Sequence, residues 1–350
     1  MSLDEVLLGP RVESYWVEVL DERDRRVGRL DEAVGGRVSW NADAVIPGGL
    51  TLDVADADVN WTKHRLRPWV LVNNRKWPLG IYLPAVNGHS RSASAPRMMA
   101  PTCLDKLSIL DNDKVERTYG VAAGTVVTTH VGGMITWCGE TNHAITPSSK
   151  KLAQSMTWPM GTAKLQIIND LLDAIAYEHV SVDLWGQYQA APWVDPRKRT
   201  PAWAFEKGDF AIHTDDIEVA QEISEVPNKV VVSTSGTDDK PALFAVATNT
   251  RSDSPHSYQA RGERWVVKAY EGVDAVDQAA LNTIASRNLW NSSTPPRAVT
   301  IQNAVIPVRG NELVSLTHDD LDMPRAIINE WSFELRGGSL MTTRLAEVPA

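Results

Sequence analysis

Two short segments combine histidine with acidic residues, and such side chains could bind a metal ion. They are residues 213–216 (His-Thr-Asp-Asp) and residues 318–322 (His-Asp-Asp-Leu-Asp). Imidazole nitrogens and carboxylate oxygens are common ligands of divalent cations. Neither segment contains a His-x-x-x-His pair or the glycine-centred loop that is typical of calcium sites. The pattern therefore favours two solvated acidic turns over two metal sites.

No serine or cysteine lies in a context that is typical of a catalytic nucleophile. A serine hydrolase of the common type has a Gly-x-Ser-x-Gly turn, and the Gly/Ser-rich segments of this chain do not fit it. Cys103 or Cys138 could pair with His130 or His143 as thiol and base, but the residues around Cys138 match no known catalytic pattern. We expect two buried thiols, and one disulfide between them stays an alternative.

Other common chemistries leave no clear signal. Carboxylate pairs for glycoside hydrolysis are defined by their distance in space, and the sequence singles out no pair. The phosphate-binding motifs Gly-x-x-x-x-Gly-Lys-Ser/Thr and Gly-x-Gly-x-x-Gly after a strand do not occur. The basic run 197–199 lies near Trp193 and Trp203 and could contact a nucleic acid, but a solvated loop or an acidic protein neighbour fits better. We predict no catalysis, no cofactor and no metal.

Composition indicates an ordinary globular protein. The 350 residues allow two to three domains. With 35 Lys and Arg against 44 Asp and Glu, the net charge is −9, which disfavours tight non-specific binding of nucleic acid. The 13 tryptophans, spread along the chain, suit cores and interfaces. We find no signal peptide and no apolar window of about 18 residues, so we expect folding in a cytoplasm and no membrane span.

Strands are predicted in the first hundred residues and again near the end. Residues 14–20 and 27–30 flank a charged turn and predict a hairpin. Residues 50–54 alternate apolar and polar side chains. Residues 229–233 and 243–247 predict a second hairpin. By contrast, residues 87–101 are rich in Ser, Ala and Pro, and we expect a connection there.

Two helices are indicated by the spacing of apolar residues. Residues 162–177 place leucine and isoleucine on one face, and Thr162 is expected to cap the helix. Residues 274–291 repeat this pattern with Asp274 as the expected cap, and residues 294–296 (Thr-Pro-Pro) are expected to stop the helix. These helices interrupt a chain that otherwise reads as strand-rich.

Several stretches, taken in order, resemble the central hub of the tail tip of long-tailed phages, of the kind encoded by phages of actinobacteria. The stretches similar to the first barrel of that family are residues 36–38, 48–52, 67–70 and 78–82. Those similar to its inserted domain and helix are residues 105–110, 123–127, 162–172 and 183–186. Those similar to its second barrel and crossing helix are residues 226–232, 280–289 and 294–297.

The resemblance implies a strand-rich α+β fold with two small β-barrel-like hub domains and an inserted mixed α/β region. The expected domains are residues 1–100 for the first barrel, 101–224 for the inserted domain, and 225–350 for the second barrel with one crossing helix. The family also implies a homotrimer whose barrels form a ring of pseudo-sixfold symmetry, and a closed ring is the symmetry that oligomers favour. Such a ring adapts a hexameric tail tube to a threefold tip.

The partners that the resemblance implies are other parts of the virion. They are a second and third copy of the chain, the distal tail protein, the C-terminus of the tape measure protein, and tail fibre or tip proteins, with phage DNA passing through on ejection. Because the chain stops at Ala350, we expect the hub without the lytic part that many relatives carry. The residues expected at interfaces are Trp69, Trp77, Leu79, Tyr82, Trp265 and Trp331.

Two alternatives from other functional classes stay open. A tail-associated peptidoglycan hydrolase would need an acid pair and would show activity on cell walls. A carbohydrate-binding module would use exposed tryptophans to stack on host sugars. The leading hypothesis is a structural tail-tip hub that is located in the virion and assembled in the host cytoplasm.

Overall fold

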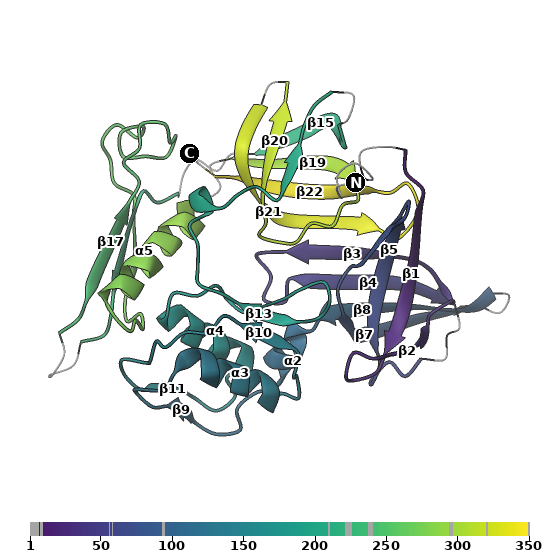
Figure 1. Cartoon of the computed structure of the whole chain (residues 1–350), viewed down its shortest axis with the longest axis horizontal. Coiled ribbons are helices and arrows are strands. Elements are labelled where there is room, and N and C mark those ends of the chain that lie inside the picture. Colours follow the sequence, from purple (N-terminus) through teal and green to yellow (C-terminus); the bar gives the residue numbers. More distant parts are fainter. Residues whose placement is uncertain are drawn as a thin grey trace.

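A computed structural model describes residue 7 and residues 10–348, apart from residues 56, 58, 93–94, 209–210, 221–225, 237–240, 294–296 and 320. It shows a large curved sheet with two smaller bodies, which we call the helical lobe and the small lobe (Figure 1). Strands far outnumber helices, which confirms the expected strand-rich α+β class. Among the described helices, none has both the length and the apolar character needed to cross a membrane.

One continuous sheet connects the first and last parts of the chain. In the described residues it contains fourteen strands: β1 (Glu13–Leu20), β2 (Arg26–Arg29), β3 (Ala33–Asn41), β4 (Gly48–Ala55), β5 (Arg65–Val72), β6 (Arg75–Pro78), β7 (Tyr82–Ser92), β8 (Ala95–Asp105), β14 (Trp203–Phe205), β15 (His213–Ala220), β19 (Ala298–Ala304), β20 (Leu313–His318), β21 (Leu321–Glu334) and β22 (Leu340–Glu347). The antiparallel pairing of β21 with β3 places Trp331 opposite Trp40. A single hydrophobic core draws on both parts, with Leu50 from one and Ile301 from the other.

The sheet curls at the end that carries β15. In the pairing order, β19, β22 and β21 separate β15 from β20. Even so, the His213 and His318 rings of these two strands lie 6.3 Å apart. Phe205 of β14, which pairs with β20, also contacts the His213 ring. Side chains thus close this end of the sheet while the described backbone ladder stays open, so the two expected barrels remain a proposal.

The first half of the sheet confirms two predictions and corrects one. β1 pairs with β2 as the expected hairpin. Leu50, Leu52 and Val54 of β4 are buried while Thr51 and Asp53 are exposed, as the alternation predicted. The connection expected over residues 87–101 is wrong, because residues 87–92 and 95–101 belong to the long strands β7 and β8, which pair antiparallel, and residues 93–94 lie outside the described residues. A shift of register in this ladder, at residues 84–86, accommodates a proline-containing sequence in a sheet.

The helical lobe has its own core. Its elements are α2 (Leu107–Asn112), β9 (Tyr119–Val121), α3 (Val127–Trp137), β10 (His143–Ile145), β11 (Met156–Trp158), α4 (Lys164–Ala174), β12 (Ser181–Val182) and β13 (Tyr188–Ala190), followed by the 3₁₀ turn η1 (Pro196–Lys198). The predicted apolar face of α4 is buried, including Leu165, Ile168 and Leu172. The expected cap is wrong: Ala163 holds the cap position, and the Thr162 hydroxyl donates instead to the Pro159 carbonyl.

In the part of the chain that the structure describes, the small lobe contains three strands and one helix: β16 (Lys229–Ser233), β17 (Phe244–Thr248), β18 (Val267–Tyr270) and α5 (Gln278–Ser293). β16 and β17 form the predicted hairpin. The cap predicted for the helix is wrong, because Asp277 accepts the Ala280 N–H while Asp274 accepts from Gln154. The helix begins at residue 278, which places Asp274 too early in the chain to cap it. Residues 294–296, expected to stop this helix, lie outside the described residues.

The hydrophobic clusters follow these three bodies. The core of the large sheet draws on residues up to Cys103 and again from Phe205 onward. The core of the helical lobe lies within residues 107–190, and the small lobe centres on β16, β17 and α5. The expected domain of residues 225–350 therefore contains both the small lobe and the last strands of the large sheet. The division into three domains stays a prediction.

Candidate functional site

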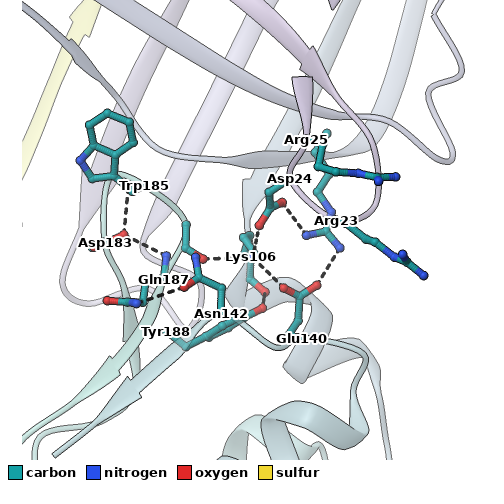
Figure 2. A network of polar contacts seen from close by, with 12 residues as sticks. Arg23, Asp24, Arg25, Lys106, Glu140, Asn142, Asp183, Trp185, Gln187 and Tyr188 are labelled. Carbon is teal, nitrogen blue, oxygen red and sulfur yellow. Dashed lines mark hydrogen bonds and ion pairs between the residues drawn. The ribbon is translucent and has the colours of Figure 1, made fainter. Parts of the chain in front are cut away.

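Four charged side chains from distant parts of the chain meet where the helical lobe joins the large sheet (Figure 2). Asp24 lies in the turn between β1 and β2, and Arg65 begins β5. Lys106 follows the last residue of β8, and Glu140 lies shortly after α3. We call these four residues the charged quartet.

Each cation of the charged quartet contacts both carboxylates. The two terminal nitrogens of Arg65 donate to Asp24 Oδ1 and to Glu140 Oε1, each at 2.7 Å. Lys106 Nζ lies 2.6 Å from Asp24 Oδ2 and 2.6 Å from Glu140 Oε2. The four groups form a closed ring of alternating charge, so their formal charges cancel.

Lys106 is the centre of this arrangement and is completely buried, with 0% of its surface exposed. Its ammonium has three donors, and the third is used by the Gly186 carbonyl at 3.0 Å. The Tyr188 hydroxyl donates to the Lys106 carbonyl at 2.7 Å. Because Gly186 and Tyr188 belong to the helical lobe, Lys106 fastens that lobe to the end of β8.

Two turns adopt left-handed backbone conformations to close this contact. Asp24 has φ 61°, a region that Asp and Asn enter more readily than most residues. Gly186 has φ 82°, and a Cβ atom at this position would lie 2.5 Å from Ile81 Cδ1. Glycine is therefore needed at 186 both for the backbone angle and for the close approach of its carbonyl to Lys106.

The Arg65 guanidinium stays charged although the residue is buried. Burial lowers the pKa of the Arg65 guanidinium, but the hydrogen bonds and charges of Glu140 and Asp24 more than offset this, so its pKa is raised overall. Removing one member of such a buried network leaves an uncompensated charge and typically costs about 3–5 kcal/mol. Separating the helical lobe from the sheet would break these ion pairs and is therefore unfavourable in free energy.

A stack of three tryptophans forms a second contact between the same two bodies. Trp16 and Trp69 lie directly opposite each other on β1 and β5, with ring centroids 5.7 Å apart and nearly parallel planes. Trp185, in the turn of the helical lobe, meets Trp69 edge-on at 5.5 Å. Asp183 holds this turn by accepting the backbone N–H of Trp185 at 2.9 Å (Figure 2). The contact is an interface, but one within a single chain.

The residues predicted at subunit interfaces divide into two groups. Buried inside the chain, with 3–8% of their surface exposed, are Trp69, Trp77, Leu79, Tyr82 and Trp331. Trp265 is 39% exposed. Burial leaves the first five little side-chain surface to offer a partner, and the subunit contact of Trp265 stays a prediction.

The sheet of the small lobe leaves one of its faces uncovered. Val230 and Val232 point to α5, whereas Val231 lies between Val246 on β17 and Ala269 on β18. The exposed fractions on this side are 65% for Phe244, 55% for Val246 and 54% for Val267. We call this surface the open face; its residues are Lys229, Val231, Phe244, Val246, Val267 and Ala269. The Trp265 ring borders it, 5.1 Å from Lys229 Nζ.

The thiols and the basic run have unremarkable surroundings. Cys103 and Cys138 are both free; the expectation of a buried thiol is confirmed for Cys103 and wrong for Cys138, which is only partly buried. Burial raises the pKa of each thiol to about 12, so neither forms a reactive thiolate at neutral pH. In the basic run, Arg197 pairs with Asp195, and Arg199 pairs with Glu178 at 2.7 Å. These pairs support the solvated-loop interpretation of residues 197–199.

The two His/Asp segments, which the sequence treats as separate turns, lie against each other. His318 Nε2 lies 3.0 Å from the Asp215 carbonyl oxygen. Among the described residues, no three or more His, Cys, Asp or Glu side chains converge as a metal site. Asp320, a member of the second segment, lies outside the described residues.

The charged quartet was missed at the level of sequence. Its members come from four separate segments, so no spacing connects them. The only available signal was the charged turn of residues 21–26, which predicted a hairpin but not a contact with Lys106. Pairs of buried opposite charges are set by tertiary structure and leave no periodic pattern.

Comparisons with known proteins give a match in fold. No protein-family model matches the chain, and no curated protein matches it in sequence. The tail protein from Neisseria meningitidis MC58 is similar with a TM-score of 0.68 and 12% identity, over 95% of this chain and 97% of that one. The 43 kDa tail protein of prophage MuSo2 from Shewanella oneidensis is similar with a TM-score of 0.63 and 11% identity, over 94% and 98%.

A third similar structure comes from a bacterial secretion system. It is an Escherichia coli component of the type VI secretion system, itself described as structurally similar to the T4 bacteriophage tail proteins gp27 and gp5. The TM-score is 0.52 and the identity 8%, over 97% of this chain and 74% of that one. Over nearly its whole length, the chain has the fold of phage tail proteins.

Proposed function

We propose that this chain is a structural hub protein of a phage tail tip, located in the virion and without a catalytic role. The observation that carries the proposal is the fold match to two tail proteins, one of them from a prophage, over at least 94% of the chain and of each neighbour. A match of this extent includes the sheet and both lobes, so it is not the likeness of one common module. The actinobacterial host stays part of the proposal.

The open face supports self-assembly. Contiguous exposed apolar surface is uncommon on proteins that act alone and often marks contacts with other chains. In the proposed trimer, three chains form a ring of pseudo-sixfold symmetry. The ring contacts the distal tail protein on one side and fibre or tip proteins on the other. The tape measure C-terminus ends at this ring, and DNA passes through it on ejection.

The charged quartet gives the proposed hub its rigidity. A ring that transmits force between tube and tip needs subunits that do not flex between their own parts. The quartet and the tryptophan stack hold the helical lobe to the sheet at two neighbouring points. Both contacts are internal, so they leave the outer surfaces free for partners.

The carboxylates of the central cleft support a non-catalytic role. This cleft, of about 1010 Å³, lies between the large sheet, the helical lobe and α5. Asp173 pairs with Arg287 at 2.8 Å, Glu178 pairs with Arg199, and Asp105 accepts two backbone N–H groups. A glycoside hydrolase needs one carboxylic acid and one free carboxylate facing the substrate. Asp183, which also lines the cleft, accepts the N–H groups of Trp185 and Gln187. Among the described residues of the lining, Asp43 is the one carboxylate without a hydrogen bond or an ion pair, so no pair of unpartnered carboxylates faces the cleft.

The native mass of the purified chain, measured across concentration, tests the proposal. We expect a species near three times 38.6 kDa to grow in with concentration. Negative-stain images of that species should show a closed ring. A strict monomer at every concentration, or an open-ended filament, would contradict the proposed ring, and lysis of cell walls by the chain would contradict the non-catalytic role.

A further inference from the structure

The helical lobe carries a pocket of its own, separate from the central cleft, which we call the aromatic pocket. Its volume is about 410 Å³. β9 and α3, which line it, lie at the end of the lobe far from strands β19, β21 and β22 (Figure 1). Pockets of this size, with aromatic walls and a few polar groups, are typical of small-molecule sites. The lining residues that matter below are Tyr119, Thr125, Thr129, His130, Gly133 and Trp137.

Trp137 forms the exposed wall of the aromatic pocket, and its ring is held in a fixed position. The residue is 58% exposed. Lys164 Nζ lies 3.7 Å from the ring centroid and also pairs with Asp113 at 2.6 Å. Lys164 is buried and is not among the lining residues, so it contacts the ring from the interior of the lobe. An exposed ring that is already ordered loses little conformational freedom when a ligand stacks on it.

Gly133 keeps the aromatic pocket open. Glycine in the interior of a helix such as α3 lowers stability relative to alanine. The neighbouring Gly132 is explained by packing, because a Cβ atom there would lie 3.1 Å from His143 Cε1. A Cβ atom at Gly133 would meet no heavy atom within 4 Å. Gly133 shares one face of α3 with His130 and Trp137, so its missing side chain leaves space inside the pocket.

The walls of the aromatic pocket are uncharged and carry polar groups. None of the described lining residues is Lys, Arg, Asp or Glu. Burial lowers the pKa of His130, so its ring is neutral at pH 7. The Tyr119 hydroxyl lies 3.0 Å from His130 Nε2, and Thr125 and Thr129 each bring a hydroxyl group. The pocket thus combines an apolar ring with hydrogen-bonding groups but offers no charge for an ionic ligand.

The position of Lys164 separates two ligand classes that both stack on aromatic rings. A quaternary ammonium would be attracted by the negative face of an indole. Here the Lys164 ammonium already occupies the Trp137 ring, and a second cation on the same ring would be repelled by it. A neutral ligand with an apolar face and several hydroxyls avoids this repulsion.

We propose that the aromatic pocket binds a neutral pyranose sugar, with the C–H face of the sugar ring stacked on Trp137. Sugar hydroxyls both donate and accept hydrogen bonds, and so do the hydroxyls of Tyr119 and Thr129. Gly133 leaves room for the sugar ring beside the helix. The inference adds a ligand to the proposed hub, and it does not depend on whether the chain forms a trimer.

The test is saturation-transfer NMR of the full chain at pH 7 with the methyl glycosides of glucose, galactose, mannose and N-acetylglucosamine, followed by titration of the best ligand. We expect at least one glycoside to bind. Trp137→Ala removes the stacking surface and should weaken binding about ten-fold or more, as loss of an aromatic anchor typically does. Trp137→Phe should recover part of the affinity. No binding of any of the four glycosides would overturn the proposal.

Gly133→Leu tests the pocket without weakening the helix. Leucine favours the helix more than glycine does, so the thermal unfolding temperature should not fall, whereas sugar binding should be lost. Trp185→Ala is the matched control, because Trp185 is 55% exposed in the same lobe but lies outside the pocket. It should bind as the unchanged chain does. Binding that survives Gly133→Leu, or an equal loss in Trp185→Ala, would overturn the proposal.

Tetramethylammonium chloride is the competing probe in the same measurement. Stronger binding of this cation than of every glycoside would replace the sugar site by a site for quaternary ammonium groups. Native mass, recorded on the same samples, keeps the two proposals apart: a monomer that binds a sugar would contradict the ring, and a trimer that binds none would contradict only the sugar site.

Discussion

Two surfaces of the molecule differ in polarity and in burial. One is the joint between the helical lobe and the large sheet; the other is the open face of the small lobe. At the joint, both cations and Glu140 are buried and Asp24 is partly buried, and every charge has its partners inside the chain. At the open face, apolar side chains lie in solvent, with Phe244 65% exposed. The charged groups of the joint find their partners within one molecule, whereas the apolar side chains of the open face are exposed to solvent.

The difference suggests separate roles for the two kinds of surface: buried charges act on folding, and exposed apolar side chains act on assembly. Buried charges demand exact partners, and a single chain can supply them at fixed distances. Apolar contacts are not directional, and burying an exposed apolar surface against any complementary apolar surface is favourable in free energy. We therefore expect changes at the joint to act on stability and changes at the open face to act on association.

The largest effect is expected for Lys106→Met. It leaves the buried Glu140 and the partly buried Asp24 with one cation between them, so the free energy of unfolding should fall by about 3–5 kcal/mol. Urea denaturation followed by tryptophan fluorescence measures the loss. Lys198→Met, at an exposed lysine, is the control and should change stability by no more than about 0.5 kcal/mol. Equal losses in both variants would show that the quartet contributes nothing special.

The double variant Lys106→Met/Glu140→Met sharpens this result. It removes one cation and one carboxylate together, leaving Arg65 paired with Asp24 at 2.7 Å. Because the remaining charges balance, most of the stability lost in Lys106→Met should return. A double variant that is less stable than the single one would mean that Glu140 stabilises the joint through contacts other than the ion pairs.

The next effect is a pH dependence from Asp105, which precedes Lys106. Burial raises the pKa of its carboxyl to about 6, against hydrogen bonds from the Leu107 and Gly48 N–H groups that lower it. The folded state therefore holds the proton more tightly than the unfolded state does. Protonation of Asp105 therefore stabilises the folded state fully below about pH 4, and this stabilisation is lost as the pH rises through about 6. The resulting decrease in the free energy of unfolding is at most about 3 kcal/mol.

Asp105→Asn isolates this contribution. The unfolding free energy of the unchanged chain, minus that of the variant, should decrease as the pH rises from about 4 to 6. Parallel urea titrations at several pH values measure the difference. A difference that stays constant with pH would show that the carboxyl titrates normally in the folded chain.

A smaller loss is expected for Trp185→Ala. Trp185 is 55% exposed, and its main contact is edge-on to Trp69. Such aromatic contacts contribute about 0.5–1.5 kcal/mol beyond the buried area. We expect a loss of about 1 kcal/mol in thermal or urea denaturation, with Trp185→Phe recovering part of it. A loss of stability as large as that of Lys106→Met would mean that the tryptophan contact stabilises the joint as much as the ion pairs do.

The smallest change in stability is expected at the open face. Val246→Glu should alter the unfolding free energy of the single chain by no more than about 0.5 kcal/mol, yet it should abolish self-association. Val219→Glu on β15 is the matched control, since Val219 and Val246 are 54% and 55% exposed. Native mass across concentration measures both. Association that survives Val246→Glu would move the proposed subunit contact to another surface.

Local features of this protein were predictable from the sequence because they depend on neighbours in the chain. The alternation over residues 50–54 and the apolar face of α4 follow from periods of two and 3.6 residues. The strand-rich class and the phage-tail resemblance rest on the order of such segments. Errors arose where local composition misled: the Ser, Ala and Pro of residues 87–101 form strands because a neighbouring strand supplies the pairing.

Tertiary structure alone decided which residues meet. Asp24, Arg65, Lys106 and Glu140 are separated by long stretches of chain, and the ion pairs between them exist only after the sheet and the helical lobe have packed. The same packing buried Trp69 and four other residues that the resemblance had led us to expect at interfaces, and left the open face exposed. A side chain's type is written in the sequence, but its solvent exposure and its partners are properties of the packed fold, because both depend on distances that the chain order does not contain.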